Sequence, residues 1–546
     1  MENNNDQKGL TTFSQTLKAP VFIISFILAA AFVIVGIALP AFGDYMDAAF
    51  TWMTTNLGWA FIIGASVFLI VTIYLIFSPL GEIKLGEDDE DPEYPTGAWF
   101  AMLFSAGMGI GLLFWGVSEP LNHYDWPPLG EAGTAATVHT ALQYSFFHWG
   151  FHPWAIYAVV ACALAYFSYR KGLPMLLSST LEPILGRDNL NGTWGNLVNI
   201  IGVLATLLGI STSLGLGVMQ IGGGLEQLFG IPNNQGLWVA IVAVVTVLAI
   251  ISTSTGIDKG IKWLSQINLS VAGLLMLIVF VVGPTLFILN ALTHSTGTYF
   301  QNLIHMSFGL DAAGEGTEGW YQAWTIFYWA WWIAWAPFVG SFIARVSRGR
   351  TIRSFAVGVL LVPTAVSMVW FSVFGGAALY NQHFAGVNIL EAVLEDEAQG
   401  FFALLSEFPV SGLLIAVAMI SVAVFFVTSS DSGTYVIGML TSKGNPNPPL
   451  GVRITWGTIE GLFAIVLLLA GGLNALQTAS FLGGFPFMLV MLLMVYCLIK
   501  ALYDELRDGS LPLERQRIFA ALEDLQRERK IDEDVITEET NDESNK

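Results

Sequence analysis

The sequence predicts an all-α polytopic membrane protein with about 12 transmembrane helices. Of its 546 residues, 54% are hydrophobic and only 12% are charged, and the mean hydropathy is +0.63. A soluble globular protein of this size would have too few polar residues to cover its surface. Several apolar runs, among them 20–42, 61–77 and 237–251, approach or reach the ~20 residues that a helix needs to cross a bilayer.

Hydropathy divides the chain into twelve expected spans, near residues 20–42, 57–78, 97–118, 138–168, 195–229, 236–253, 263–291, 319–345, 354–381, 410–440, 454–472 and 476–502. If the N-terminus is cytoplasmic, every Lys and Arg lies in a terminus or in a cytoplasmic connection, as the positive-inside rule requires. A shift of the count by one span would scatter these charges over both faces. We therefore expect both termini in the cytoplasm. The first run is too long for a removable signal peptide and lacks a small-residue cleavage site.

The connections between the spans are expected to be solvated or to lie on the membrane surface. The acidic segment 86–93 is typical of an exposed, charged linker. The stretches 295–317 and 387–408 are amphipathic, which is typical of short helices on the outer membrane face. Residues 513–531 have the pattern of a charged amphipathic helix, and an acidic tail follows it.

The cysteines and histidines form no recognisable metal or redox motif. Cys162 and Cys497 both fall inside expected spans and are expected to be small apolar packing residues. His148 and His152 lie one helical turn apart with no Glu between them, so the sequence lacks a zinc-protease motif. We expect them to cap or to hydrogen-bond within the bundle. Because no nucleophile–base pair or phosphate loop emerges either, an intramembrane enzyme is disfavoured.

Two segments are expected to interrupt their own spans. Gly107, Gly109 and Gly111 stand at alternate positions in the third span, where each glycine costs ~1 kcal/mol relative to alanine in a helix interior. The segment 428–433 places five polar residues in the tenth span. In hydrocarbon, polar or non-helical segments survive where they line a cavity or are covered by protein. Close helix packing would also explain the glycines alone, but the two segments together favour broken helices around a site near the membrane midplane.

The eighth span is unusually rich in aromatic residues, with four tryptophans between residues 329 and 335. At ~100° per residue, Trp331 and Trp335 share a helix face, while the other two lie around the cylinder. Such a surface suits a quaternary ammonium, which has no N–H to donate and is bound by the π faces of aromatic rings. The alternative is a lipid-interface aromatic belt. Belts lie at helix ends, whereas this span continues to residue 345, which favours a ligand cage.

Two motifs resemble the betaine/carnitine/choline transporter family. One comprises Gly107-Met108-Gly109-Ile110-Gly111 and Ser118-Glu119-Pro120, and the other is Phe327–Arg353 with its basic exit. The likeness covers nearly the whole chain and implies a LeuT-like fold, in which two five-helix inverted repeats follow two extra N-terminal helices. The implied segments are a cytoplasmic N-terminal segment, the two extra helices with the acidic loop, the first repeat (helices 3–7), an external amphipathic connection, the second repeat (helices 8–12) and a cytoplasmic C-terminal tail, at residues 1–19, 20–96, 97–292, 293–318, 319–502 and 503–546 respectively.

The resemblance also implies an aromatic box between the fourth and eighth spans. Glycines of the third span would let the backbone approach a substrate carboxylate without Cβ clashes. Choline-preferring members of the family commonly carry Asp at the position of Gly111, so this glycine favours a zwitterion. The matching substrate-binding residues are Trp149, Trp154, Tyr157, Trp331, Trp332, Trp335, Gly107, Gly109, Gly111 and Ser213, and the matching gating residues are Phe114 and Phe327.

Sodium sites are implied in the same way. One would lie between the third and tenth spans, with ligands from Ser105, Met108, Phe425, Thr428 and Ser429. A second family site uses two threonines one turn apart in the fifth span and a phenylalanine that matches Phe338. The first threonine is Thr206, but the second position is Ile210, which offers no side-chain oxygen. This departure places the second sodium, and a two-sodium stoichiometry, in doubt.

Together these features predict a sodium symporter of the bacterial cell inner membrane that takes up glycine betaine or a similar quaternary-ammonium zwitterion as an osmoprotectant. Its expected partners are the onium substrate, sodium as coupling ion and membrane lipid, with no other cofactor and no nucleic acid. The family resemblance also implies that two further copies complete a homotrimer. Choline, carnitine, dimethylsulfoniopropionate and ectoine remain alternative substrates. A membrane solute sensor without flux is the alternative from another functional class.

Overall fold

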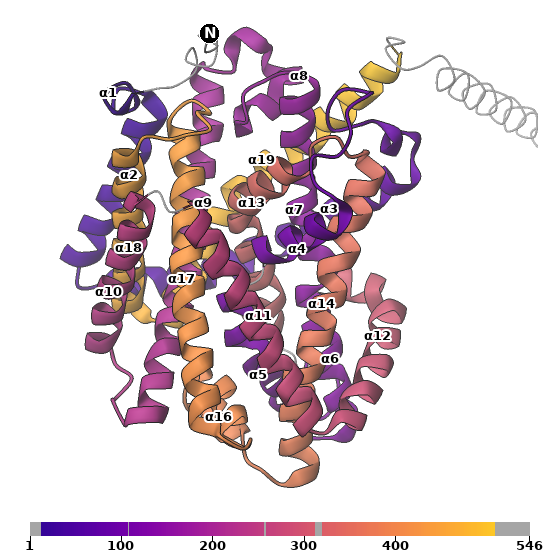
Figure 1. The fold of residues 1–546 in the computed structure, drawn as a ribbon, viewed down its shortest axis with the longest axis vertical. Helices are drawn as coiled ribbons and strands as arrows, with labels where there is room; N and C mark the ends of the chain where they lie inside the picture. Colours follow the sequence, from indigo (N-terminus) through magenta and orange to yellow (C-terminus); the bar gives the residue numbers. More distant parts are fainter. Residues whose placement is uncertain (1–11, 108, 256–257, 312–318, 508–546) are drawn as a thin grey trace, which may run out of the picture. The chain divides into compact units, whose positions relative to one another are not determined.

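The computed structural model describes residues 12–107, 109–255, 258–311 and 319–507, except for the side chains of 104–107, 255 and 258–264. In this part of the chain the elements are helices, and no strand is present (Figure 1). The α-helices are α1 (Phe13–Thr16), α2 (Pro20–Ala38), α3 (Phe42–Phe77), α4 (Thr96–Gly107), α5 (Ile110–Asp125), α6 (Ala135–Trp149), α7 (Phe151–Ala165), α8 (Glu182–Leu185), α9 (Thr193–Phe229), α10 (Gln235–Thr255), α11 (Asp258–Val282), α12 (Thr285–Ser307), α13 (Phe327–Val346), α14 (Ile352–Tyr380), α15 (Leu390–Glu395), α16 (Gly400–Ser406), α17 (Ser411–Thr441), α18 (Leu450–Gly471) and α19 (Leu473–Arg507). Short 3-10 or π segments are η2 (Pro79–Glu82), η3 (Tyr166–Arg170), η4 (Leu177–Leu181), η5 (Arg187–Asn189), η6 (Gln322–Ile326), η7 (Asn381–Ala385) and η8 (Glu397–Gln399).

Eleven helices in the described ranges are long and apolar enough to cross a membrane. They correspond to every predicted span except the third, so the chain is an all-α, multi-pass membrane protein. The third span consists of α4 and α5, which have 12 and 16 residues and are separated by residues 108 and 109. The interruption that the alternating glycines predict is therefore present.

The seventh span is shorter than predicted. Helix α11 ends at Val282, and a new helix, α12, begins at Thr285, so the prediction that this span reaches residue 291 is wrong. Pro284 has no backbone N–H and cannot continue the hydrogen-bond ladder of α11. The amphipathic helix predicted at 295–317 therefore begins earlier, as α12, and residues 312–318 lie outside the described ranges. The helix predicted at 513–531 lies outside them as well.

Helix α13, which holds the tryptophan cluster, packs against α7 on one side and α9 on another. The long helix α9 also packs along α17 (Figure 1). Glycines permit these close approaches: a Cβ at Gly209 of α9 would lie 2.9 Å from Trp335 Cδ1 and 3.0 Å from the carbonyl carbon of Ala334. Small residues are the usual means of close helix packing in membranes. The cluster is thus enclosed by protein and does not face lipid as a belt would.

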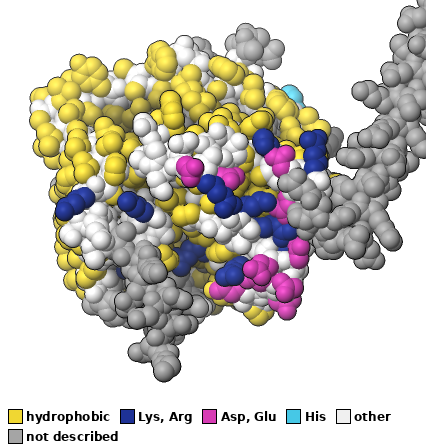
Figure 2. All heavy atoms as spheres, turned by 90° about the horizontal axis from the view of Figure 1, so that it is seen from above, with side chains coloured by type: hydrophobic (Ala, Val, Ile, Leu, Met, Phe, Trp, Pro, Cys, Tyr) yellow, Lys and Arg dark blue, Asp and Glu magenta, His cyan; other side chains and the backbone are white. Residues whose placement is uncertain are grey.

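The acidic segment 86–93 is largely exposed, as predicted, but it is also attached to the loop after α13. Backbone hydrogen bonds join Glu93 N to Arg348 O at 3.3 Å and, just before the segment, Leu85 N to Arg350 O at 2.8 Å. Ion pairs add Arg348 to Glu90 at 2.5 Å and Arg170 to Asp88 at 3.0 Å. Figure 2 shows basic and acidic side chains together on this end of the molecule, flanked by hydrophobic surface.

A short helical cap in the predicted external loop between α14 and α17 contains a perturbed carboxyl group. The hydroxyl of Ser118 in α5 donates to the carbonyl of Glu397 in η8 at 2.7 Å. Glu397 Oε2 is enclosed, without a hydrogen-bond partner among the described residues. Burial, followed by the negative charge of Asp396, raises the pKa of Glu397 from 4.5 to about 8.

Because of this raised pKa, we expect the folded protein to become less stable as pH rises. Between about pH 4.5 and about pH 8, the folded protein retains a proton on Glu397 that the unfolded chain releases, so unfolding becomes more favourable as pH rises. Above about pH 8, the protonated Glu397 no longer contributes to the free energy of unfolding. Thermal unfolding of the purified protein across this range should show the slope, and Glu397→Gln should reduce it. The exposed Glu407→Gln is the matched control, and equal slopes in both variants would contradict the assignment.

Candidate functional site

Three predicted tryptophans meet in the interior of the bundle. The rings of Trp331 and Trp332 stack, with centres 4.7 Å apart and planes inclined by 14°. Trp149, the last residue of α6, stands nearly perpendicular to both, at 4.9 Å from Trp332 and 6.2 Å from Trp331. All three are buried. They form a corner of aromatic faces and edges between the fourth and eighth spans.

Gly111 lies where the two walls of this corner converge. A Cβ built on Gly111 would lie 2.8 Å from Trp149 Cη2 and 2.9 Å from Trp331 Cη2. Any side chain at this position would therefore push against both indoles. Gly111 is also in the first turn of α5, where backbone N–H groups lack intrahelical partners and the helix dipole favours an anion. The corner thus combines aromatic faces with the N-terminus of a helix.

The indole N–H groups of α13 are held by neighbouring backbone and side chains. Trp331 Nε1 donates to Ser213 Oγ at 3.2 Å, which places Ser213 of α9, a predicted substrate-binding residue, against the aromatic corner. Trp332 Nε1 donates to the carbonyl of His148 at 2.9 Å. Trp335 Nε1 donates to the carbonyl of Gly209 at 2.8 Å, so this ring packs toward α9. These bonds fix the orientation of each ring.

Tyr157 and Trp154 extend the wall formed by the fourth span. The ring of Tyr157 lies 6.3 Å from Trp332, and Trp154 lies 5.6 Å from Tyr157, one ring further from α13. Both are buried, and within the described residues neither the Tyr157 hydroxyl nor Trp154 Nε1 has a hydrogen-bond partner. An unpaired buried hydroxyl is costly in the absence of ligand. Tyr157 therefore offers a polar contact beside the aromatic corner.

Glu119, to which sequence reasoning assigned no role, joins several parts of the site. Its Oε2 accepts from Trp149 Nε1 at 2.8 Å and from the Tyr328 hydroxyl at 2.5 Å. Its Oε1 lies 2.7 Å from His148 Nδ1 and 3.2 Å from His123 Nε2. One fully buried carboxylate thereby connects α5, α6 and α13. The sequence feature that could have singled out Glu119 is its charge within a membrane span, since an intramembrane carboxylate is rarely without a function.

Glu119, His123 and His148 also have the ligand types of a transition-metal site. The two carboxylate oxygens already have four neighbours at hydrogen-bonding distance, which accounts for the cluster without an ion. His148 Nε2 lies 2.9 Å from Thr325 Oγ1, so both of its ring nitrogens are engaged, as expected for a histidine that hydrogen-bonds within the bundle. His152 differs: its ring stacks on Trp329, and its nitrogens have no partner in the described part of the chain.

Other aromatic residues surround the corner. Phe371 of α14, which no sequence motif singled out, lies 5.4 Å from Trp149. The predicted gating residue Phe327 stacks on Trp331 at 5.7 Å, with planes 11° apart. The other, Phe114, contacts Trp115 at 4.8 Å, and Trp115 lies 6.3 Å from Phe327. The two gating candidates are thus connected through one intervening ring.

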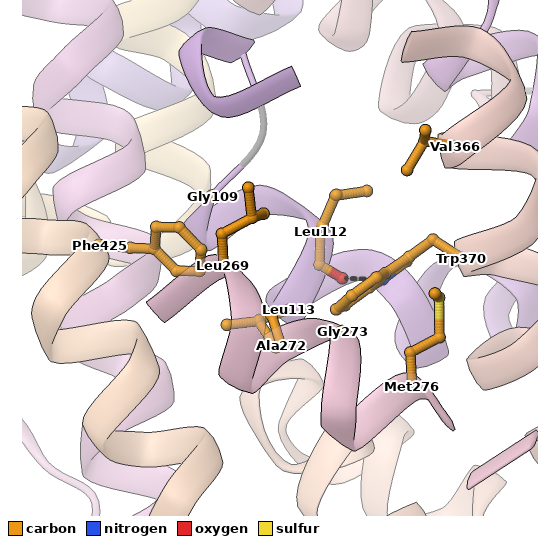
Figure 3. Close-up of a pocket in the computed structure, with 10 residues that line it drawn as sticks. All are labelled: Gly109, Leu112, Leu113, Leu269, Ala272, Gly273, Met276, Val366, Trp370 and Phe425. Carbon is orange, nitrogen blue, oxygen red and sulfur yellow. Dashed lines mark hydrogen bonds between the residues drawn. The ribbon is translucent and has the colours of Figure 1, made fainter. Parts of the chain in front are cut away.

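A cavity of about 220 Å³ lies beside the interrupted third span, between α5, α11, α14 and α17. Figure 3 shows Gly109 and Phe425 at one side of it and Trp370 at the other. The lining is apolar, and the Trp370 indole N–H donates to the carbonyl of Leu112 at 2.9 Å. The cavity therefore adjoins the predicted sodium region, but it does not include the tryptophans of the corner.

The region of the predicted first sodium site is described only in part. A Cβ on Gly109 would lie 3.4 Å from the Phe425 ring, so the interruption of the third span meets α17. The Thr428 hydroxyl donates within its own helix, at 3.0 Å to Val424 O and 3.2 Å to Phe425 O. Met108 lies outside the described residues. Gly107 ends α4, and only the helical backbone of Ser105 is described there.

The predicted interruption of the tenth span is absent, because α17 runs without a break through residues 428–433. Three of its polar side chains find partners. Thr428 bonds to carbonyls one turn earlier, Ser430 bonds to Glu460, and Asp431 pairs with Arg453. A polar sequence in a membrane helix therefore did not require broken backbone here.

The predicted second sodium site remains incomplete. Thr206 donates its hydroxyl to the carbonyl of Gly202 at 2.7 Å. Phe338 packs against Trp335, with ring centres 5.6 Å apart. The Ile210 side chain lies against the backbone of Gly433 and presents only methyl groups there, with no oxygen for a cation.

Comparisons with known proteins identify the family of this chain. The family model described as BCCT, betaine/carnitine/choline family transporter, matches residues 20–507. The glycine betaine transporter OpuD of Bacillus subtilis is 49% identical over 89% of this chain and 95% of its own length. A probable glycine betaine transporter of Desulfitobacterium hafniense is 43% identical over 89% and 97%. An ectoine/hydroxyectoine transporter of Virgibacillus pantothenticus is 43% identical over 88% and 95%.

The family match covers all of the membrane-spanning helices, and the relatives are covered over nearly their full length. Neither the family model nor these relatives describe an enzyme. The chain is therefore a membrane transporter and belongs to the betaine/carnitine/choline transporter family.

Proposed function

We propose that this transporter takes up glycine betaine, or a similar quaternary-ammonium zwitterion, by sodium-coupled symport and alternating access. The proposal rests mainly on the position of Gly111, which lies between the edges of Trp149 and Trp331 in the first turn of α5. A trimethylammonium group is bound by aromatic faces, whereas a carboxylate is bound by free N–H groups at a helix start. A zwitterion presents both groups within a few bonds of each other.

In this mechanism the ammonium group lies against Trp149, Trp331 and Trp332. The carboxylate points toward the first turn of α5 and the hydroxyl of Ser213, which already contacts Trp331. Sodium would be held by oxygens of Ser105, Met108, Phe425, Thr428 and Ser429. Its charge would favour the carboxylate nearby and couple the two binding events. Phe114 and Phe327 would close the path to the corner on the external side.

We propose that the chain also has the localisation, oligomeric state and internal repeats expected of the family. This proposal places the chain in a bacterial inner membrane as a homotrimer in contact with lipid, with both termini cytoplasmic and with two inverted repeats at 97–292 and 319–502. The absence of Lys and Arg from the predicted external loops supports the orientation. The attachment of the acidic segment 86–93 to the basic loop after α13 is consistent with both lying on the cytoplasmic side.

Uptake of labelled betaine into proteoliposomes tests the function. We expect accumulation with an inward sodium gradient and none with potassium on both sides. A sensor without flux would bind betaine yet show no uptake under either condition. Competition by choline, carnitine, dimethylsulfoniopropionate and ectoine would rank the substrates. Ectoine is the second candidate, because one relative at 43% identity carries it in its name.

The sodium site is tested separately by Ser429→Ala. Removal of one oxygen ligand should cost ~1–2 kcal/mol, which corresponds to a rise of roughly tenfold in the sodium concentration for half-maximal uptake. Ser432→Ala, a change of the same size three residues further along α17, is the matched control. If the two variants have the same sodium curve as the unmodified protein, the cation site lies elsewhere.

A further inference from the structure

Glu460 is a second buried carboxyl group, and it lies away from the aromatic corner. It occupies the middle of α18, which is one of the membrane spans, and its exposed fraction is 0%. Helix α18 packs against α9, α10 and α17. An ionisable group at this depth is expensive and usually marks an ion or proton pathway.

The two carboxyl oxygens of Glu460 have different surroundings. Oε2 accepts a hydrogen bond from Ser430 Oγ of α17 at 2.9 Å. Oε1 has no hydrogen-bond partner in the described part of the chain. It lies close to the backbone of Gly433 in α17, where a Cβ would lie 3.1 Å from Oε1 and 2.3 Å from Ile210 Cδ1. Oε1 is therefore a buried oxygen without a hydrogen-bond partner in the described part of the chain, and it lies between α9, α17 and α18.

No basic residue compensates this carboxyl group within the described ranges. The nearby Arg453 pairs with Asp431, its Nη2 lying 3.0 Å from Asp431 Oδ1. The hydroxyl of Thr253 donates to the same oxygen of Asp431. The negative charge of Asp431, one residue after Ser430, makes an uncompensated charge on Glu460 still less favourable. An ionised Glu460 would be a buried charge without a partner, which proteins avoid.

We propose that Glu460 is the carboxylate of a buried site for a small monovalent cation, a proton or a sodium ion. Either cation neutralises the charge and engages Oε1. The hydroxyl of Ser430 contacts the carboxyl group of Glu460, and the hydroxyl of Ser211 donates to its backbone carbonyl at 3.4 Å. The contact with α9 and α17 would let occupancy of the site influence how these two helices pack.

This site differs from the sodium site proposed around Ser429. Ser430 bonds to Glu460 in α18, whereas the Ser429 site would lie toward Gly109 and the third span. The proposal also does not depend on the substrate. Cation binding can be measured on the full-length purified protein without betaine, so it can fail while betaine uptake succeeds, and the reverse.

Two measurements on the full-length protein test the site. Infrared difference spectra would follow the C=O band of a protonated carboxyl group during a rise in pH and during addition of sodium at fixed pH. Binding of radioactive sodium, without substrate, would count bound ions. Glu460→Gln has nearly the same shape and cannot bind a cation as a carboxylate does. The exposed Glu407→Gln is the matched control for the same chemical change.

If the occupant is a proton, the unmodified protein should show a carboxyl band that disappears at high pH, and Glu460→Gln should lack that band while keeping its sodium count. If the occupant is sodium, Glu460→Gln should bind one fewer sodium ion per chain. If Glu460→Gln keeps both the carboxyl band and the full sodium count, the proposal is wrong. Glu460→Asp guards against misfolding, because it keeps the carboxyl group and should retain one of the two signals. Failure of Glu460→Asp to do so while eluting as a folded protein would also count against the site.

Discussion

Replacement of Trp332 by alanine is expected to raise the dissociation constant for glycine betaine about 30-fold. Trp332 occupies the centre of the aromatic corner, stacked on Trp331 and 4.9 Å from Trp149. A desolvated cation–π contact contributes about 2 kcal/mol, and each 1.4 kcal/mol corresponds to a factor of ten. Loss of this one ring therefore removes an aromatic face from the site and also the support for the orientation of its two neighbours.

The indole N–H of Trp332 adds a second effect. It donates to the carbonyl of His148, close to the point where α6 ends at Trp149 and α7 begins at Phe151. Alanine would leave this buried carbonyl without that donor, at a cost of ~1–3 kcal/mol. Trp332→Phe separates the two effects, because it retains an aromatic face and loses only the donor. It should bind betaine more tightly than Trp332→Ala but less tightly than the unmodified protein.

Equilibrium binding of labelled betaine, together with thermal unfolding, would distinguish loss of contact from loss of fold. The expected result is a large loss of affinity with a smaller change in melting temperature. Trp329→Phe is a suitable control, since Trp329 stacks on His152, away from Trp149. Unchanged affinity in Trp332→Ala would refute the placement of the ammonium group at this corner.

Features that depend on local sequence could be predicted well. The eleven long spans follow from apolar runs, and the interruption of the third span follows from three alternating glycines, because both depend on residues close together in the chain. The tryptophan cluster in α13 is of the same kind. The contact between Trp149 and Trp331, however, joins residues that are far apart, and only the family resemblance placed them together.

Other features depend on partners that a single sequence does not identify. The polar segment in α17 looked like broken backbone, yet Ser430 and Asp431 find partners on α18 and the helix continues. The break at Gly150 was not expected either. There Phe151 N–H donates to the hydroxyl of Tyr299, which comes from α12. The role of Glu119 likewise required its four neighbours, which come from α5, α6 and α13.

Gly111→Asp should reverse the preference of the site between betaine and choline. The new Cβ would enter the space between Trp149 Cη2 and Trp331 Cη2, which are only 2.8 and 2.9 Å from its position. The added carboxylate would then stand beside the ammonium pocket and at the start of α5, where the substrate carboxylate is expected. Two like charges at roughly 4 Å repel by about 4 kcal/mol near a protein surface. We therefore expect betaine affinity to fall at least about 100-fold.

Choline has no carboxylate, so it avoids this repulsion and gains an ion pair between its ammonium group and the introduced carboxylate. Its affinity relative to betaine should consequently rise by a similar factor, measured as inhibition of labelled-substrate uptake by each compound. Two controls isolate the charge: Gly111→Ala adds only the Cβ, and Gly111→Asn adds a side chain of the same size without charge. Both should weaken betaine and choline alike through contact with the indoles. If Gly111→Asn shifts the preference as strongly as Gly111→Asp, steric crowding rather than charge selects the substrate, and Gly111 does not mark the carboxylate end of the site.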